Sequence, residues 1–122
     1  MVERRILRLL LVDNSPDDVE LAVAALRKAG YKLKSQLVPD LAGFQTTFDK
    51  GEWDAVLTEF ALPHFNAQFV IDHIKHSGLD LPVLVLTRAI ADPDFARIMQ
   101  FGARDVVLKN HLARLAPAME RE

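Results

Sequence analysis

The sequence contains no cysteine, which excludes disulfide bonds and thiolate metal sites. It also lacks any long uncharged apolar stretch, so we expect neither a signal peptide nor a membrane span and place the protein in the cytoplasm. Positive and negative charges nearly cancel, giving a formal net charge of -2 and a pI near 6.1. A surface without a strong field of either sign is not expected to bind nucleic acid or anionic lipid directly.

The length and the apolar content together predict one compact domain over residues 1–122. The chain has 122 residues, of which 50% are hydrophobic, enough for a single buried core. Short apolar runs alternate with stretches of helical periodicity along its whole length. The runs predicted to be strands are Ile6–Val12, Leu33–Val38, Asp54–Glu59, Val83–Thr87 and Asp105–Leu108.

A helix is predicted after each of these runs. The first has the clearest signals, with Ser15 as N-cap, Pro16 at the first helical position, Asp17 and Asp18 beside the positive helix end, and Gly30 at the C-terminus. The side chains expected to face the core are Val19, Val23 and Leu26; Leu41, Phe44 and Phe48; Ala67, Val70, Ile71 and Ile74; Phe95, Ile98, Met99 and Gly102; and Leu112, Leu115, Ala116 and Met119. The last stripe has no glycine stop, so we expect this helix to continue in a longer parent protein.

Five strands alternating with five helices predict a doubly wound α/β fold, with a five-stranded parallel sheet covered by helices on both faces. In such sheets, ligand chemistry collects beyond the carboxyl ends of the strands. The polar residues at those ends are Asp13, Asn14, Glu59, Thr87 and Lys109. The sequence therefore predicts that they share one crevice.

Four motifs carry these residues: VDNSPDD, EFALPHF, LT and GARDVVLK. In this order and spacing, they resemble the receiver (response-regulator) domains of bacterial two-component signalling over essentially the whole chain. The segments SGLDLP and LKNHLARLAPAMERE are similar to receivers that precede sensor, GGDEF, EAL or kinase modules in larger proteins. The resemblance implies a flavodoxin-like receiver fold and a signalling role rather than an enzyme.

The resemblance also assigns roles at the strand ends. In this family an aspartate after the third strand accepts a phosphoryl group from a histidine kinase or a small phosphodonor, beside a divalent cation held by acidic neighbours. That acceptor position is Glu59, and the acidic pair becomes Asp13 and Asn14. The backbone carbonyl of Ala61 takes the third position for a protein ligand to the metal.

Two departures from the family pattern predict a site that does not take up phosphate in the ordinary way. Glu59 is one methylene longer than aspartate, about 1.5 Å, which moves its carboxylate into the space of the phosphoryl group and spoils in-line attack. Asn14 lacks the negative charge that helps to recruit Mg²⁺, so the site of Asp13, Asn14, Glu59 and Ala61 is expected to bind this ion weakly or not at all.

Thr87 and Lys109 match the hydroxyl and the ammonium that bind phosphoryl oxygens in the family. We expect Glu59 to pair with Lys109 instead and to hold the site in one state. A further departure is Val106, which stands where the family has an aromatic switch residue three positions before the lysine.

The predicted function is therefore that of an atypical receiver: a phosphorylation-independent regulatory or dimerisation module that governs an attached or separate output domain. The resemblance places its contact surface on the face of the fourth helix, fifth strand and fifth helix. The residues expected on that surface are Phe95, Arg97, Arg104 and Arg114.

Two other functions remain open at this point. The first is a receiver that still takes phosphate, on Glu59 or elsewhere. The second is a small flavodoxin-like or phosphotransfer enzyme, which is disfavoured because the acidic loop at Asp13 lacks glycines and would repel a cofactor phosphate. His73 and His76 lie three apart on one predicted helix and could share a metal, but no third ligand is apparent.

Overall fold

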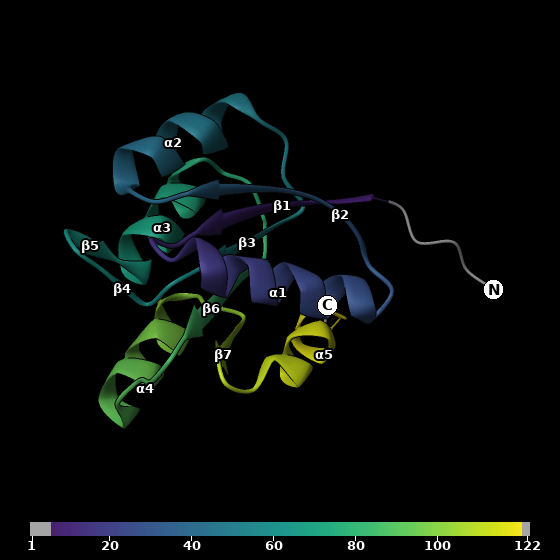
Figure 1. Cartoon of the computed structure of the whole chain (residues 1–122). Coiled ribbons are helices and arrows are strands. Elements are labelled where there is room, and N and C mark those ends of the chain that lie inside the picture. Colours follow the sequence, from purple (N-terminus) through teal and green to yellow (C-terminus); the bar gives the residue numbers. More distant parts are fainter. Residues whose placement is uncertain (1–5, 121–122) are drawn as a thin grey trace.

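A computed structural model describes residues 6–120 of the protein, and its centre is a sheet of five parallel strands (Figure 1). The strands are β1 (Ile6–Val12), β2 (Lys32–Val38), β3 (Ala55–Thr58), β6 (Val83–Thr87) and β7 (Asp105–Leu108). Their order across the sheet is β2-β1-β3-β6-β7, and every neighbouring pair is parallel. The predicted doubly wound fold is confirmed.

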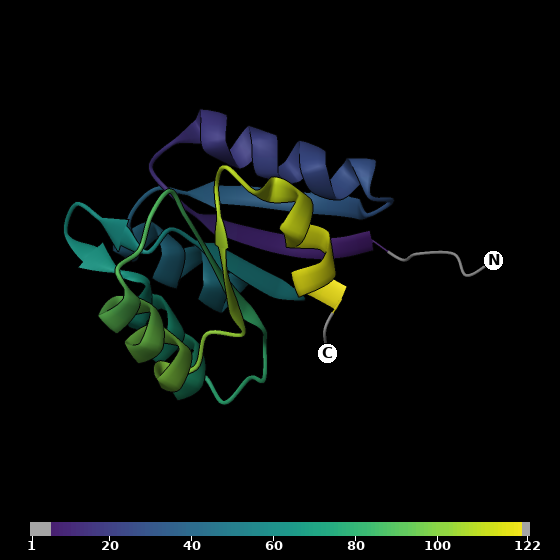
Figure 2. The ribbon, with the colours of Figure 1, turned by 90° about the horizontal axis from the view of Figure 1, so that it is seen from below.

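The helices form a layer on each face of this sheet (Figure 2). One layer holds α1 (Pro16–Lys28) and α5 (Leu115–Glu120), and the other holds α2 (Leu41–Lys50), α3 (Ala67–His76) and α4 (Asp92–Phe101). None of the helices in the described part of the chain is long and apolar enough to cross a membrane.

The two layers divide the core into two clusters. Leu9 and Leu11 of β1 pack with the residues of α1 and α5, whereas Leu10 and Val12 pack with those of α2 and α3. Because both faces of the sheet are covered, the central strands β3 and β6 are buried at every position and read as continuous apolar runs.

The signals for the start and end of the first helix act as predicted. The Ser15 hydroxyl accepts the Asp18 N–H at 3.4 Å, and Pro16 is the first helical residue. The helix ends at the C-cap Ala29, and Gly30 follows with φ of 102°, a conformation that favours glycine. This start points the first turn of α1 at the carboxyl end of the sheet.

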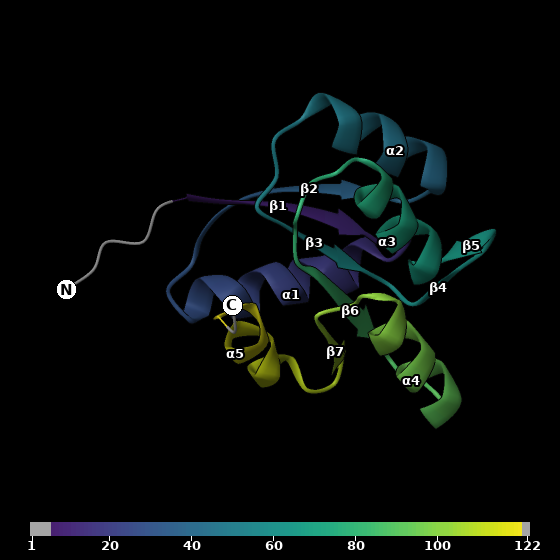
Figure 3. The same ribbon diagram turned by 180° about the vertical axis from the view of Figure 1, so that it is seen from behind.

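The predicted inward stripe of α4 is wrong at its first and last residues, Phe95 and Gly102, which are both exposed. Phe95 is 41% exposed, and Ile98 is the residue of this helix that is buried. The helix lies beside β6 and the edge strand β7, at the margin of the sheet (Figures 1 and 3), so only a narrow stripe of it is covered.

The predicted last helix is broken in two. A 3-10 turn over Leu112–Arg114 precedes α5. The expected stripe still faces the core, since Leu115 is buried and Leu112, Ala116 and Met119 are partly buried against the same cluster. Pro117 explains the break, because it has no N–H and could not continue a helix that began at Leu112. In α5 it occupies the first turn, where that N–H has no helical partner.

The sequence did not predict the small hairpin of β4 (Ala61–Leu62) and β5 (Phe65–Asn66), which lies beyond the carboxyl end of β3 (Figures 1 and 3). Leu62 and Phe65 are both 8% exposed and anchor the hairpin to the core. Asn66 then caps α3 by accepting the Gln68 N–H at 2.9 Å. The segment after Glu59 is therefore ordered by its own apolar contacts.

Candidate functional site

The predicted crevice lies where three strands end. β1 stops just before Asp13, β3 just before Glu59, and β7 just before Lys109. The Glu59 N–H donates to the Val12 carbonyl at 2.8 Å, which continues the pairing of the two central strands to the edge of the crevice. Parallel pairing thus brings together residues that are far apart in the sequence.

The Lys109 ammonium is the centre of the site. Its Nζ lies 2.8 Å from Glu59 Oε1, 2.9 Å from Asp13 Oδ2 and 3.0 Å from Asp18 Oδ2. The lysine side chain is only 8% exposed. Burial by itself lowers the pKa of Lys109, but hydrogen bonds to Glu59, Asp13 and Asp18 outweigh it and raise that pKa above its ordinary value, so the group stays charged. The predicted pair of Glu59 and Lys109 is confirmed.

Asp18 is the member of the site that sequence reasoning missed. The sequence alone predicts only that this residue stabilises the positive end of a helix. Its carboxylate binds Lys109 and also Arg88, whose Nη2 lies 2.9 Å from Oδ1 and 3.0 Å from Oδ2. The Lys109 hydrogen bond is the main reason that the pKa of Asp18 is below its ordinary value. One signal was available, because a helix that starts at the crevice turns its first-turn side chains toward it.

Each oxygen of these three carboxylates accepts a hydrogen bond. Asp13 Oδ1 accepts the Ser15 N–H at 3.0 Å, and Glu59 Oε2 accepts the Phe60 N–H at 2.6 Å. The remaining four oxygens receive Lys109 or Arg88. Beneath Asp13 and Glu59, the apolar floor leaves no room for a water molecule. The site is a closed network of paired charges.

Nearly the whole chain matches one protein family. The sequence matches the family described as response regulator receiver domain over residues 9–120. The chain belongs to the response regulator receiver family.

Curated relatives of the receiver domain are much longer proteins. Two-component response regulator ORR26 of Oryza sativa subsp. japonica is 28% identical over 106 residues, which cover 84% of this chain and 18% of that protein. Regulator of RpoS of Escherichia coli (strain K12) is 32% identical over 56 residues, which cover 46% of this chain and 17% of that protein. The chain spans less than a fifth of the length of these relatives.

Solved structures share the fold. The receiver domain of sensor histidine kinase PA1611 from Pseudomonas aeruginosa PAO1 superimposes with a TM-score of 0.78 at 24% identity, covering 96% of this chain and 97% of that one. That protein is described with a magnesium ion coordinated in its own active-site cleft. At this identity, the likeness concerns the fold alone.

The four residues of the predicted Mg²⁺ site do not fit such an ion as they stand. Asn14 and Ala61 are exposed, and Ala61 begins the β4–β5 hairpin. The Lys109 ammonium contacts the Asp13 and Glu59 oxygens that a bridging cation needs. Within residues 6–120, no group of three or more His, Asp or Glu side chains is arranged to hold a metal ion.

Thr87 is buried at the end of β6, next to Lys109, as the predicted crevice requires. Its hydroxyl donates to the Ala89 carbonyl at 3.4 Å, and its own carbonyl accepts the Lys109 N–H at 2.8 Å.

Val106 is also buried and lines a hollow of about 420 Å³ between α4 and β7.

His73 and His76 do not converge. His73 Nε2 lies 2.8 Å from Asp49 Oδ1, with the ring packed edge-on against Phe44 and Phe48. His76 Nδ1 lies 2.8 Å from the Asp72 carbonyl oxygen on the same helix. The first histidine ties α3 to α2, and the pair does not form a metal site.

Proposed function

We propose that this receiver domain regulates a two-component pathway through protein contacts and without phosphorylation of an aspartate. The observation that carries the proposal is the state of Glu59 at the acceptor position. One of its oxygens binds the Lys109 ammonium at 2.8 Å, and the other binds the Phe60 N–H at 2.6 Å.

This geometry opposes phosphoryl transfer. A nucleophilic oxygen must be free to approach the phosphorus in line with the leaving group, with nearby charge already neutralised. Both Glu59 oxygens are instead engaged by donors, and the side chain is only 12% exposed. The longer side chain turns back onto its own loop, where it accepts the N–H of Phe60.

The proposed contact surface is the α4–β7 face, which we define by Arg88, Phe95, Val106 and Arg114. These residues line the hollow of about 420 Å³, and Phe95 is 41% exposed beside it. An apolar hollow with arginines at its rim suits an apolar side chain flanked by acidic groups.

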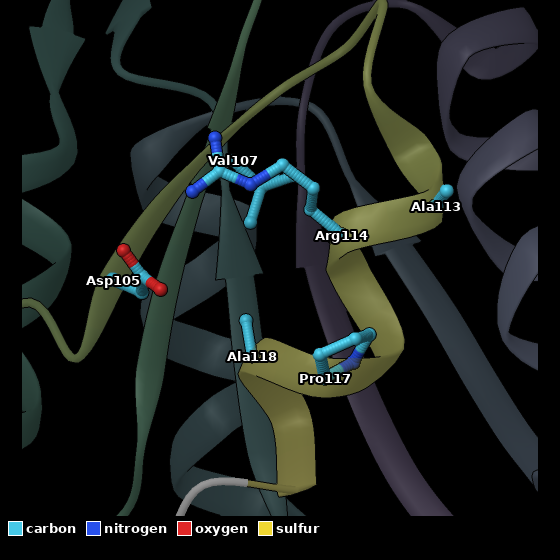
Figure 4. Close-up of a pocket in the computed structure, with 6 residues that line it drawn as sticks. All are labelled: Asp105, Val107, Ala113, Arg114, Pro117 and Ala118. Carbon is cyan, nitrogen blue, oxygen red and sulfur yellow. The ribbon is translucent and has the colours of Figure 1, made fainter.

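A second hollow, of about 490 Å³, adjoins this face between β7 and α5 (Figure 4). Arg114 extends over it from the 3-10 turn, while Pro117 and Ala118 of α5 form its other side. Because β7 is an edge strand, both hollows lie along the open margin of the sheet.

Two other predicted surface residues have local roles on this side of the molecule. Arg97 is exposed and pairs with Asp94 of the same helix at 3.2 Å. Arg104 is half-buried just before β7. The face is thus built from paired charges around Phe95, and its proposed occupants are a second copy of the chain or an output domain.

Intact mass measurement after treatment with acetyl phosphate and Mg²⁺ tests this function. We expect wild type to gain no phosphate, because Glu59 offers no attacking oxygen. The double variant Glu59→Asp, Asn14→Asp restores the acceptor and the second acidic residue, and we expect it to gain one phosphoryl group.

The matched control is Glu59→Asn with Asn14→Asp, which keeps the shorter side chain but cannot form an acyl phosphate. A phosphorylated wild type would overturn the proposal, and peptide mapping would then locate the modified residue. If the restored variant also stays unmodified, departures beyond these two positions close the pocket.

A further inference from the structure

Side chains of the protein itself supply both the negative and the positive charges of the pocket. Three carboxylates, of Asp13, Asp18 and Glu59, surround one buried ammonium, and Arg88 contacts one of them from outside. Three negative and two positive charges leave a single net negative charge. A divalent cation would therefore enter a pocket whose negative charge is already largely neutralised.

The placement of Lys109 makes the competition direct. A cation held by Asp13 and Glu59 would compete with the ammonium for the two oxygens that lie 2.9 and 2.8 Å from Lys109 Nζ. The opposite oxygens of the same carboxylates accept backbone N–H groups at 3.0 and 2.6 Å. Mg²⁺ gives up its water reluctantly and demands near-octahedral oxygen ligands, so it would have to displace the ammonium rather than join it.

Asp18 explains why the lysine stays in this place. A lysine side chain has four flexible carbons, and Asp13 and Glu59 both contact its ammonium from the strand ends of the sheet, so a third contact from another element restricts it further. Asp18 approaches from α1 and holds Nζ at 3.0 Å, while Arg88 fixes the Asp18 carboxylate through both oxygens. The Lys109 and Asp18 side chains are 8% and 12% exposed, so their contact is less screened by solvent than the contact of Asp18 with Arg88, which is 74% exposed.

We propose that the Lys109 ammonium is the resident cation of this pocket and that Asp18, held by Arg88, is the positioning residue that keeps it there in place of a divalent ion. The inference rests on the proposed function in one respect, since both assign the pocket a single fixed state. It adds that this state is independent of Mg²⁺.

The first test is a titration with MgCl₂ alone, followed by ¹H–¹⁵N NMR of the backbone amides. We expect the Ser15 and Phe60 amides of wild type, which bond to the acidic oxygens, to keep their positions. In Lys109→Met, the three carboxylates lose their cation, and we expect these amides to move with Mg²⁺ bound at least about tenfold more tightly than by wild type.

The control is Lys32→Met, which removes an exposed lysine at the start of β2 and should not respond to the ion. If Lys109→Met folds only when Mg²⁺ is added, that result supports the proposal. If it does not fold at all, Lys109→Gln replaces it in the same titration. Saturable shifts in wild type, or a folded Lys109 variant that ignores Mg²⁺, would overturn the inference.

These outcomes separate the inference from the proposed function. Wild type that binds Mg²⁺ but gains no phosphate from acetyl phosphate contradicts only the resident cation. Wild type that is phosphorylated contradicts the proposed function, whatever its affinity for the ion.

The second test addresses Asp18 as the positioning residue, through the ¹H–¹⁵N signal of the Lys109 side-chain ammonium. In wild type, we expect slow exchange with water and a visible signal. Asp18→Asn should broaden or remove it, whereas Asp17→Asn, a change one residue away on the exposed side of the same helical turn, should not. An unchanged signal in Asp18→Asn would show that Asp18 does not hold the lysine.

Discussion

The carboxylate pocket lies at the carboxyl ends of the strands, whereas the α4–β7 face lies along the edge strand β7 of the same sheet. The two differ in how fully their side chains are paired and covered. In the pocket, every oxygen of Asp13, Asp18 and Glu59 has a donor, and the space beneath is filled. On the α4–β7 face, Phe95 is exposed instead, and the hollows on both sides of β7 are open to solvent. We therefore expect the pocket to contribute mainly to stability and the α4–β7 face to association with a partner.

This difference separates two tasks that the family usually couples. A pocket that changes its charge can pass a signal to the surface, but a pocket with all its groups paired cannot change without losing stability. Arg88 is the structural link, because it binds Asp18 and also lines the hollow beside Phe95. Substitutions in the pocket should therefore affect stability, and substitutions on the face should affect association.

The largest effect is expected for Lys109→Met. Removing the ammonium leaves three acidic groups facing one another at the end of the sheet, and breaking a buried ion pair in this way costs about 3 kcal/mol. Urea unfolding at pH 7 would measure the loss. Lys32→Met is the matched control, since that exposed lysine should change the free energy of unfolding little. Equal stability of Lys109→Met and wild type would contradict the ion-pair network.

Asp18→Asn is expected to have a smaller effect that depends on pH. At pH 7 the loss of its charged hydrogen bonds should lower the free energy of unfolding by about 1.5 kcal/mol. Because the pKa of Asp18 in the folded state lies below its ordinary value of 3.8, this stabilisation is present above that pH. It is lost as the pH falls from 3.8 through the lowered pKa.

The difference between wild type and Asp18→Asn should thus shrink in acid, and unfolding curves at a series of pH values would show it. Asp17→Asn shares the helix-end position of Asp18 but is exposed, so it isolates the effect of the pocket from that of the helix. A difference that stays constant down to the lowest pH would contradict the role of the Asp18 charge.

The smallest effect on stability, less than about 1 kcal/mol, is expected for Phe95→Ser, because the ring is already largely in solvent. Its effect should appear in association instead, as a loss of self-association in sedimentation equilibrium. Phe69→Ser is the control, because Phe69 is 53% exposed but lies on α3, away from the α4–β7 face. Self-association as tight as that of wild type would remove Phe95 from the contact surface.

Much of the fold was predictable because local and global signals agree in it. Continuous apolar runs marked the buried parallel strands, and Ser15 with Pro16 marked the start of α1. The pair of Glu59 and Lys109 followed from the ends of β3 and β7. The strands and the helix start were each marked within one short segment, whereas the pair required the parallel order of two strands.

The remainder depended on packing between distant segments. Asp18 already had a sufficient local explanation at a helix start, and its place in the first turn beside the crevice was the one signal that pointed to Lys109. The exposure of Phe95 follows from the marginal position of α4, which periodicity does not show. The 3-10 turn before α5 follows from Pro117, which cannot continue a helix that begins at Leu112.

The span of the pocket contacts has a consequence for the order of folding. Lys109 and Asp18 are 91 residues apart in the sequence, so their contact forms only after β7 has joined the sheet. Until then Asp13, Asp18 and Glu59 face one another without the Lys109 ammonium, and we expect their repulsion to oppose the closing of the early strands. The Lys109 ammonium removes this repulsion when β7 joins the sheet, so we expect the pocket to form late in the folding reaction.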